Sequence, residues 1–378
     1  MSSIQVVEVK TKGQMWKFVN FPLRLFKGNP KYVPCFYAEE MALIRKDSVY
    51  NEFSKSTFWL CYKDGKIAGR IGAIEHFAYI KKTGKKIMRF TRFDCINDFE
   101  VAKALFDTAE DFARSKGYEY VHGPWGYTDM DKEGMMTEGF EYPCTYATLW
   151  NDPYYPEFME RLGYEKECEW IERRLSGDID LGPKVEKFAP LIKQRYQLTD
   201  IADTKMSTKK IVKRYVGPIF DLLNVCYADL DGFTDLTPHF RDEVVKSIQL
   251  VLDKKFISIL VDPEDNLIGV GVAVRGLGEA LNKSGGKFFP FGWVHFLKAL
   301  GSRNRELELF FIAVRPDYQS KGLTSIMMDK IMHSIKKEKI RGIETNCTLE
   351  ENHPINNLWD NYPHIKHKRR RCYVKKIV

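Results

Sequence analysis

The chain repeats one order of predicted elements twice, and this duplication restricts its fold more than any other feature of the sequence. In the first half, two helical stretches (14–26 and 38–45) precede a predicted β-hairpin at 56–76, whose turn falls at Asp64-Gly65. A strand, an amphipathic helix and another strand follow within 89–123. A short helix and terminal strands complete this half.

The second half shows the same order with different residues. Helical stretches at 209–228 and 238–252 precede a hairpin at 255–276, and a strand–helix–strand unit occupies 307–346. The repeat is roughly 180 residues, too long for a solenoid unit, so it indicates duplication of a whole domain. The polar stretch 176–190, which contains Gly and Pro, is the predicted joint. We therefore expect an α+β (α/β mixed) fold of two tandem domains, 1–178 and 179–378, each a mixed, mainly antiparallel sheet flanked by helices.

The segment AVRPDYQSKGL (313–323) joins the predicted strand at 307–314 to a predicted amphipathic helix. A helix N-terminus exposes unpaired N–H groups and the positive end of the helix dipole, which together attract anions. Gly322 would let a ligand approach the backbone. We expect a phosphorylated ligand to bind at this turn, although Pro and Gly here are also ordinary turn residues.

Composition excludes several classes of protein. The chain is 44% hydrophobic, and no apolar stretch approaches the ~20 residues of a membrane span. The N-terminus has no signal-peptide pattern, so we expect a cytoplasmic protein with no membrane partner. The eight cysteines occur singly, which argues against a zinc site or a disulfide framework, and we assign no metal ligands. The net charge of +8 suits anionic ligands without demanding nucleic acid.

The element order and the pattern V-x-P-x-Y-Q-x-x-G-L at the central turn resemble the GNAT superfamily of acyl-CoA-dependent N-acyltransferases. Its motif is (Q/R)-x-x-G-x-(G/A), whose backbone N–H groups hold the CoA pyrophosphate. Gln319 to Leu323 match, whereas Thr324 departs from Gly/Ala. The resemblance covers nearly the whole chain as two GNAT-like domains. The segments GPWGYTDMDKEGMMTEGF and NDPYYPEFMERLGY also resemble a bacterial subfamily of uncharacterised two-domain GNAT proteins.

This resemblance implies an acyl-CoA-dependent N-acyltransferase that uses acetyl-CoA or another acyl-CoA and acts on an amine of a small molecule or peptide. The alternative is a non-catalytic acyl-CoA sensor. The oligomeric state stays open, a homodimer included. The residues implied in cofactor binding are Val314, Gln319, Ser320, Lys321, Gly322, Leu323, Thr324 and Asn352. Asn352 could instead only cap the short helix that follows it.

Two residues are the catalytic candidates. Glu308 stands eleven residues before Gln319, the spacing of the glutamate base in histone-acetylating members of the superfamily. It shares one strand face with Glu306, so the two could also be an exposed polar pair. In relatives a tyrosine serves as the general acid that protonates the leaving thiolate. This chain has Trp359 at that position, and its indole cannot act as this acid. Tyr362, three residues on, could replace it or pack in the core.

The first repeat lacks the features of the turn. Shifting the halves by 222 residues aligns Asn97–Glu100 with Gln319–Gly322. Carboxylates at a helix N-terminus satisfy the helix dipole themselves and would repel a pyrophosphate. We therefore expect one CoA site for each chain, in the second domain.

Three other segments offer weaker signals. The insertion 275–300 is glycine-bearing and aromatic, and it could be a mobile lid over the acceptor, with His295 as a base or as a structural residue. The loop 227–240 carries Asp229, Asp231 and Asp235, which could attract an amine or simply be solvated. The tail 364–376 holds seven Lys/Arg. It could bind nucleic acid or the adenosine 3′-phosphate of CoA. No nucleic-acid motif accompanies it, so we expect a last strand with Ile365, Tyr373 and Ile377 inward and the basic residues outward.

Overall fold

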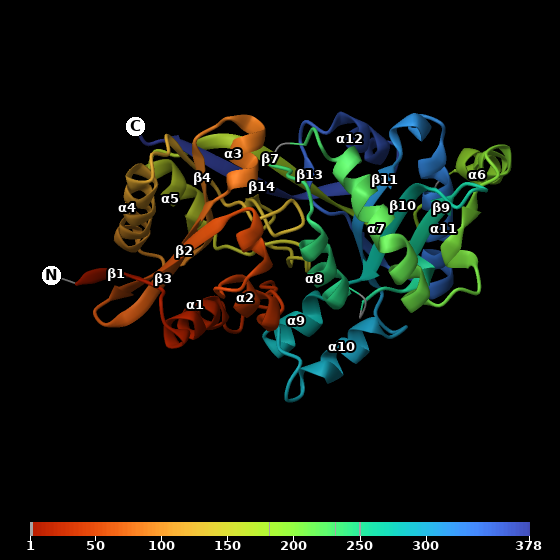
Figure 1. The fold of residues 1–378 in the computed structure, drawn as a ribbon. Coiled ribbons are helices and arrows are strands. Elements are labelled where there is room, and N and C mark those ends of the chain that lie inside the picture. The colour runs from red at the N-terminus through yellow and green to blue at the C-terminus, as the bar shows by residue number, and fades with distance from the viewer. Residues whose placement is uncertain (1–2, 181, 231, 249–250) are drawn as a thin grey trace.

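A computed structural model describes residues 3–180, 182–230, 232–248 and 251–378. Figure 1 shows the two halves of the chain side by side, with helices on both faces of a continuous twisted sheet. The helices α1, α2, α9 and α10 lie together along the lower edge in this view. No helix among these residues is long and apolar enough to cross a membrane.

The first half begins with the expected two helices and hairpin, since Thr11 caps the first helix through a capping box and Asp64-Gly65 form the hairpin turn, both with positive φ. Its elements are β1 (Ile4–Glu8), α1 (Lys12–Leu25), α2 (Tyr37–Leu43), η1 (Val49–Glu52), β2 (Lys55–Lys63), β3 (Lys66–Glu75), α3 (Phe77–Thr83), β4 (Ile87–Cys95), α4 (Phe99–Ser115), β5 (Tyr120–Gly123), β6 (Met135–Glu138), α5 (Tyr154–Arg161) and β7 (Glu165–Ser176).

The second half repeats this order after an additional helix. Its elements are α6 (Pro183–Arg195), β8 (Thr199–Asp200), η2 (Ile201–Asp203), α7 (Thr208–Cys226), α8 (Pro238–Ile248), η3 (Lys254–Phe256), β9 (Ile257–Val261), β10 (Leu267–Arg275), α9 (Gly278–Ser284), α10 (Gly292–Leu300), β11 (Glu306–Val314), η4 (Pro316–Tyr318), α11 (Leu323–Glu338), β12 (Gly342–Glu344), β13 (Thr348–Leu349), α12 (His353–Asp360) and β14 (His364–Lys376). The predicted fold class is thus confirmed: a mixed α/β chain with two similar halves.

The two halves exchange their last strands. Among the described residues the strands form one fourteen-stranded sheet, in the order β1-β2-β3-β4-β5-β14-β7-β12-β11-β10-β9-β8, with β6 and β13 as side branches. The C-terminal strand β14 pairs with β5 of the first half, and β7 of the first half pairs with β12 of the second. β14 and β7 pair with each other along most of their length (Figure 1). The domain boundary at 178/179 stays a prediction. Backbone hydrogen bonds connect the residues on its two sides through the β14–β5 and β7–β12 pairs.

The basic tail is a strand, but its charges do not all point outward. Lys368 and Arg370 are buried and Ile365 is exposed, so that part of the prediction was wrong. Tyr373 and Ile377 are buried as expected. The reason is the partner strand: Glu172 on β7 lies 2.8 Å from the Lys368 ammonium and 2.5 Å from the Arg370 guanidinium. A buried cation is tolerated where a carboxylate of this kind faces it.

Candidate functional site

The turn at 315–322 connects β11 to α11 as the sequence predicted. Gly322 is the N-cap of α11 with φ of 82°, and no side chain caps the helix. Ser320 also has a positive φ, of 60°. The Ser325 N–H donates to the Gly322 carbonyl at 3.0 Å, so the available donors are the N–H groups at the very start of α11. Turns with left-handed residues of this kind form concave anion-binding nests. The turn therefore has the backbone geometry of an anion site.

Side chains around this turn are mostly engaged with one another. Arg315 donates two hydrogen bonds to Asp317, at 2.7 and 2.9 Å, and the Gln319 amide donates to the Val314 carbonyl at 3.1 Å. The Lys321 ammonium lies 4.7 Å from the centre of the Tyr318 ring. Lys321 is therefore the exposed cation placed to add positive potential to the turn.

Gly322 has a structural reason to be glycine as well. A Cβ at this position would meet the Ile192 side chain of α6 at 2.6 Å, and the positive φ disfavours any side chain. The glycine alone therefore does not identify a ligand, and the open helix N-terminus is the stronger signal.

The equivalent turn of the first half is closed by its own side chain. Asp98 caps α4 by accepting from the Glu100 N–H at 3.1 Å, and its other oxygen pairs with Lys63. Because Asp98 and Gly322 are the two N-caps, the halves align with a shift of 224 residues, so the shift of 222 was wrong by two. The contrast between the turns survives, since a carboxylate occupies the position of Gly322.

Glu308 is buried where the two halves of the chain meet, a region that we call the seam. It is not part of an exposed pair. Its two oxygens accept from the N–H groups of Tyr146, in the first half, at 3.1 Å, and of Leu277 at 3.2 Å. Burial raises the pKa of Glu308 to about 7, although these two donors act in the opposite direction. Glu306, in contrast, is half-exposed and pairs with Arg174 at 2.8 Å. A carboxyl group with a pKa near 7 can take up and release a proton under physiological conditions.

The sheet opens directly after Glu308. The parallel strands β11 and β12 pair only over Glu306–Glu308 and Gly342–Glu344. On the other side of β11, Val272 pairs with Phe311 and Ala273 with Leu309, so Phe310 is an extra residue in a β-bulge. Beyond this point the Phe310 carbonyl accepts from the side chain of Asn346 at 2.8 Å. The pairing of β11 with β12 therefore ends beside a buried carboxyl group, and we call this point of divergence the wedge.

Tyr362 does not contact Glu308. It is partly buried against the apolar cluster formed by Leu175, Leu307, Ile343 and Trp359, together with Leu309. Since side chains alternate along a strand, Glu308 and Leu309 face opposite sides of β11. Burial raises the pKa of Tyr362, which keeps its hydroxyl protonated. Asn352 accepts from the Ile355 N–H at 3.4 Å as the N-cap of α12, the structural role left open by the sequence.

The first half provides residues of the site that the sequence did not reveal. An aromatic row, defined here as Phe288, Phe296, Phe36, Tyr146 and Phe310, runs from the 275–300 insertion to the bulge beside Glu308. Successive ring centres lie 4.4 Å (Phe288–Phe296), 5.4 Å (Phe296–Phe36), 5.3 Å (Phe36–Tyr146) and 5.9 Å (Tyr146–Phe310) apart. The row therefore gives the region beside Glu308 an apolar wall made by both halves.

A buried ionic cluster lies in the first half near the same seam. Arg92, which has a φ of 48°, lies 3.1 Å from Glu40 and 3.8 Å from Asp131. Burial favours protonation of Glu40, but Arg92 and Arg70 outweigh it and lower its pKa to about 2. The sequence contains a sign of this buried cluster, because Arg89, Arg92 and Asp94 interrupt a strand whose other residues are apolar or Thr. Its partner in space, Glu40, lies far away in the sequence.

The residues predicted from the 227–240 loop and the 275–300 insertion differ in their exposure to solvent. Asp229 and Asp235 are exposed, and Asp231 lies outside the described residues. His295, on α10, is partly buried. Phe296 is buried and Phe288 is partly buried, whereas Phe289 and Phe291 face solvent, so the insertion lines the seam with only some of its aromatic residues.

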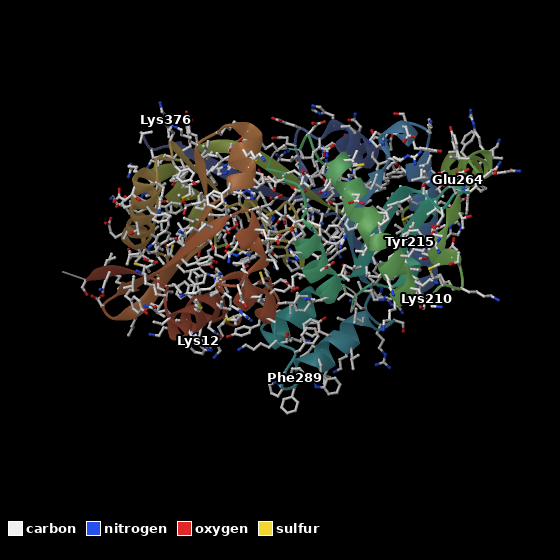
Figure 2. All side chains as sticks on the ribbon, in the orientation of Figure 1. Lys12, Lys210, Tyr215, Glu264, Phe289 and Lys376 are labelled. Carbon is white, nitrogen blue, oxygen red and sulfur yellow. The ribbon has the colours of Figure 1, made fainter. Side chains whose placement is uncertain are left out.

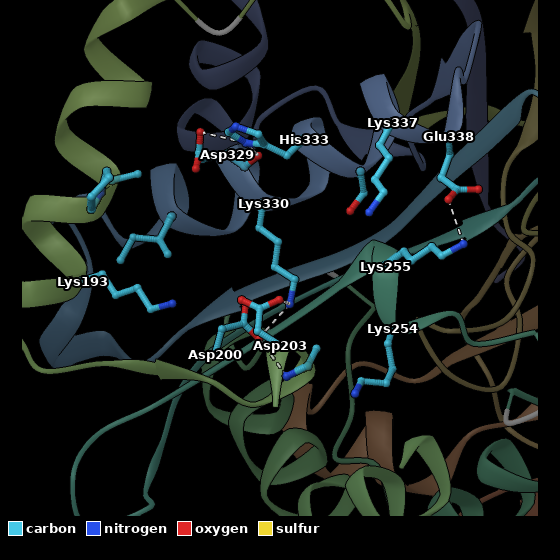
Figure 3. Close-up of a pocket in the computed structure, with 15 residues that line it drawn as sticks. Lys193, Asp200, Asp203, Lys254, Lys255, Asp329, Lys330, His333, Lys337 and Glu338 are labelled. Atoms are coloured by element: carbon cyan, nitrogen blue, oxygen red, sulfur yellow. Dashed lines mark hydrogen bonds and ion pairs between the residues drawn. The ribbon is translucent and has the colours of Figure 1, made fainter. Parts of the chain in front are cut away.

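A cavity of about 670 Å³ lies elsewhere, between α6, α11 and η3 (Figure 3). Lys330 bridges Asp200 at 3.0 Å and Asp203 at 2.8 Å within it, and Lys255 pairs with Glu338 at 2.8 Å. Neither Glu308 nor the 315–322 turn lines this cavity. It is lined largely by paired charges and is separate from the wedge at β11.

Residues 221–361, which contain the turn, Glu308 and the wedge, match the model of the acetyltransferase (GNAT) family. The matched segment lies entirely within the second half of the chain. The whole chain also superposes on a tandem GNAT protein from the clavulanic acid biosynthesis pathway, with a TM-score of 0.57 at 11% identity, covering 100% of this chain and 99% of that one. A GCN5-related N-acetyltransferase from Sphaerobacter thermophilus superposes with a TM-score of 0.50 at 8% identity, covering 98% and 96%. The expected tandem GNAT fold is confirmed.

Two bacterial proteins are similar in sequence over nearly their full lengths. Protein YghO of Escherichia coli K12 is 24% identical, covering 97% of this chain and 94% of that protein. The bacterial ceramide synthase of Caulobacter vibrioides is 24% identical, covering 100% of this chain and 98% of that protein. The match to the acetyltransferase family model supports acyl transfer as the general chemistry.

Proposed function

We propose that this protein is an acyl-CoA-dependent N-acyltransferase whose second domain holds the cofactor and whose first domain helps to bind the acceptor. The observation that carries the proposal is Glu308: a buried carboxyl group with a pKa of about 7, beside the wedge between β11 and β12 and on the strand that leads to the 315–322 turn. The cofactor-binding residues are those of the turn and its flanks, Val314 and Gln319 to Thr324, with Asn352 at the α12 end.

The residues present fit the anionic part of CoA. The open N-terminus of α11, the left-handed Ser320 and Gly322 and the exposed Lys321 suit a pyrophosphate. The first-half turn cannot bind it in this way, because Asp98 already caps α4. One CoA site for each chain follows. The thiols of all eight cysteines are unpaired, which suits a reducing cytoplasm, the compartment we propose.

The reaction would follow the ordinary course of amide formation. Acyl-CoA supplies an activated thioester. The acceptor nitrogen forms a bond to the thioester carbonyl carbon, Glu308 takes one N–H proton, directly or through a water, and the C–S bond breaks to release CoA. The thiolate then gains a proton from Tyr362 or from a water. The two backbone donors that hold Glu308 fix its position at the seam.

The acceptor we propose is an amine that carries a long apolar chain. The aromatic row gives the seam an apolar wall that a small polar amine would not need. The similarity to a bacterial ceramide synthase points the same way, since a ceramide is the N-acyl derivative of a long-chain amino alcohol. The acyl group is acetyl or longer, and an acyl-CoA series of increasing chain length decides between them.

The test is release of free CoA thiol from purified protein, with acyl-CoAs of several lengths and with short-chain and long-chain amines. We expect turnover with a long-chain amine, and a loss of about 100-fold in kcat for Glu308→Gln with unchanged CoA affinity. In the parent, kcat/KM should rise with pH and level off above about 7, since the deprotonated carboxylate is the base. Glu306→Gln, two residues along the same strand, is the matched control and should retain activity.

Tyr362→Phe decides the source of the final proton. A fall in kcat of tenfold or more with unchanged KM would assign it to Tyr362, and an unchanged kcat would assign it to water.

The separation of Tyr362 from Glu308 also favours a second candidate function, an acyl-CoA sensor. Stoichiometric CoA binding without turnover on any amine would establish that alternative.

A further inference from the structure

The 275–300 insertion ends in an apolar tip that no other described part of the chain covers. Phe289 is 82% exposed, Phe291 75%, Leu297 62% and Trp293 46%. All four lie within nine residues, at the start of α10 and in the turn before it. Figure 2 shows Phe289 at the extreme lower edge of the molecule, pointing away from it. Large apolar side chains that gather at one exposed point mark an interaction site.

The charge around the tip is mainly positive, although Glu279 of α9 pairs with Lys283 and Glu8 pairs with Lys10. Residues 281–305 contain five Lys/Arg and no Asp or Glu. Residues 9–38, which form α1 and the approach to α2, contain six Lys/Arg and no acid. These two segments carry eleven positive charges, more than the net +8 of the chain, so the remainder is net negative by three.

The two segments lie on the same side of the molecule. The Asn282 amide donates to the carbonyls of Asn29 and Tyr32, at 2.9 and 2.7 Å, and Lys287 lies 4.5 Å from the centre of the Tyr37 ring. Figure 1 shows α1, α2, α9 and α10 together along the lower edge. On α1, Trp16 is also exposed, with Arg24 against its ring. Two basic segments thus lie on the side of the molecule from which the apolar tip projects.

The exposed tip rests on a base of packed aromatic side chains. Phe288 and Phe296 stack on each other at 4.4 Å and on Phe36 of the first half. Phe289 and Phe291 are therefore presented outward by a packed base. Trp and Phe projecting from a basic face are the side chains that enter the interface of a bilayer, where apolar rings meet hydrocarbon and Lys/Arg meet anionic headgroups.

We propose that α9, α10 and the basic face of α1 dock this protein on an anionic lipid bilayer, with Phe289, Phe291, Trp293 and Leu297 inserted at the interface. This proposal differs from the expectation of a protein without a membrane partner, since it places the protein at the surface of the membrane. The aromatic row leads from the inserted tip to the bulge beside Glu308. Docking would accordingly bring the candidate site next to amphiphilic molecules in the bilayer, although the docking itself does not depend on the proposed function.

The test is co-sedimentation of the full chain with vesicles of phosphatidylcholine containing phosphatidylglycerol, and with vesicles of phosphatidylcholine alone. We expect partitioning onto the anionic vesicles that weakens as salt is added. The double variant Phe289→Ser/Phe291→Ser should bind them at least about tenfold more weakly. Lys298→Glu/Arg303→Glu should lose at least as much, since each charge near an anionic surface contributes about fivefold.

Matched controls are available on other surfaces. Phe188→Ser/Leu191→Ser removes two half-exposed apolar side chains of α6, and Lys209→Glu/Lys210→Glu reverses two exposed charges of α7. Both should bind as the parent does. All of these positions are exposed, so circular dichroism should show every variant folded.

Three results would overturn the proposal. The first is no binding to anionic vesicles, and the second is equal binding to neutral and anionic vesicles. The third is self-association that Phe289→Ser/Phe291→Ser abolishes while vesicle binding is absent, which would assign the tip to a second copy of the chain. None of these measurements uses catalytic turnover, so failure of the proposed acyl transfer leaves the test intact.

Discussion

Glu308 shows how one residue can be both structural and chemical. Its oxygens hold the Tyr146 loop of the first half and the Leu277 backbone that begins the insertion, yet burial raises its pKa to about 7. A carboxyl group that is easier to protonate in the folded chain than in the unfolded chain destabilises the fold once it ionises.

The stability of the chain should record this ionisation. Because the folded pKa of Glu308 is raised from 4.5 to about 7, its contribution is fully present below about 4.5 and is lost as pH rises through 7. We expect a loss of about 3 kcal/mol from this group between those limits. Denaturant melts of the parent and of Glu308→Gln at several pH values measure it, since the amide stays neutral throughout. The difference between the two proteins should fall with pH.

Lys368 belongs to the seam between the halves and should be sensitive to truncation. Its ammonium lies 2.8 Å from Glu172, and both side chains are buried. Lys368→Met leaves Glu172 with Arg370 alone and should lower the free energy of unfolding by about 3 kcal/mol, the usual result of breaking a buried pair. Lys376→Met, at the exposed end of the same strand, should change it by less than about 0.5 kcal/mol. Equal effects of the two substitutions would contradict the assignment of a tight central ion pair.

At the scale of an element, the N-terminus of α11 is the feature to test. Gly322 is a poor site for this purpose because any side chain there is strained and meets Ile192. Thr324, in the first turn of α11, has neither problem. A carboxylate there would complement the helix dipole but face the pyrophosphate we propose to bind.

Thr324→Glu should keep or raise the thermal stability and weaken CoA binding at least about tenfold. Two like charges about 4 Å apart at an effective dielectric near 20 repel by about 4 kcal/mol, and a third of that gives the tenfold loss. Calorimetric titration with CoA measures it. Thr324→Gln is the neutral control of similar size and should bind CoA within about threefold of the parent. If the Glu and Gln variants bound CoA equally, the anion site would lie elsewhere.

At the scale of the molecule, strand exchange makes the two halves one folding unit. β14 separates β5 from β7, so each half alone would lack the strand that completes its sheet. An unpaired β5 or β12 is an exposed sheet edge, which invites aggregation.

We expect residues 1–178 and 179–378 to be insoluble or only partly folded when each is produced alone. Produced together, they should form a stable one-to-one complex. The intact chain should unfold in one cooperative transition by both fluorescence and far-UV circular dichroism. Two independent soluble folded halves would contradict the importance of the exchanged strands.

Local patterns in the sequence determined much of this architecture. The hairpin turns, the helix following Gln319 and the repeated element order depend on turn chemistry and on apolar spacing within a few residues, so they could be predicted directly. The predicted shift between the two halves was wrong by two residues, because only backbone geometry shows that Asp98 is the cap of α4.

Tertiary structure alone decided the rest. No local pattern states that β14 crosses to the first half, and the burial of Lys368 and Arg370 follows only from Glu172 lying opposite them. The surroundings of Glu308 come from Tyr146, 162 residues away. Strand order and the pKa of a buried group depend on which distant surfaces meet, and that is settled by packing the whole chain rather than by the residues on either side.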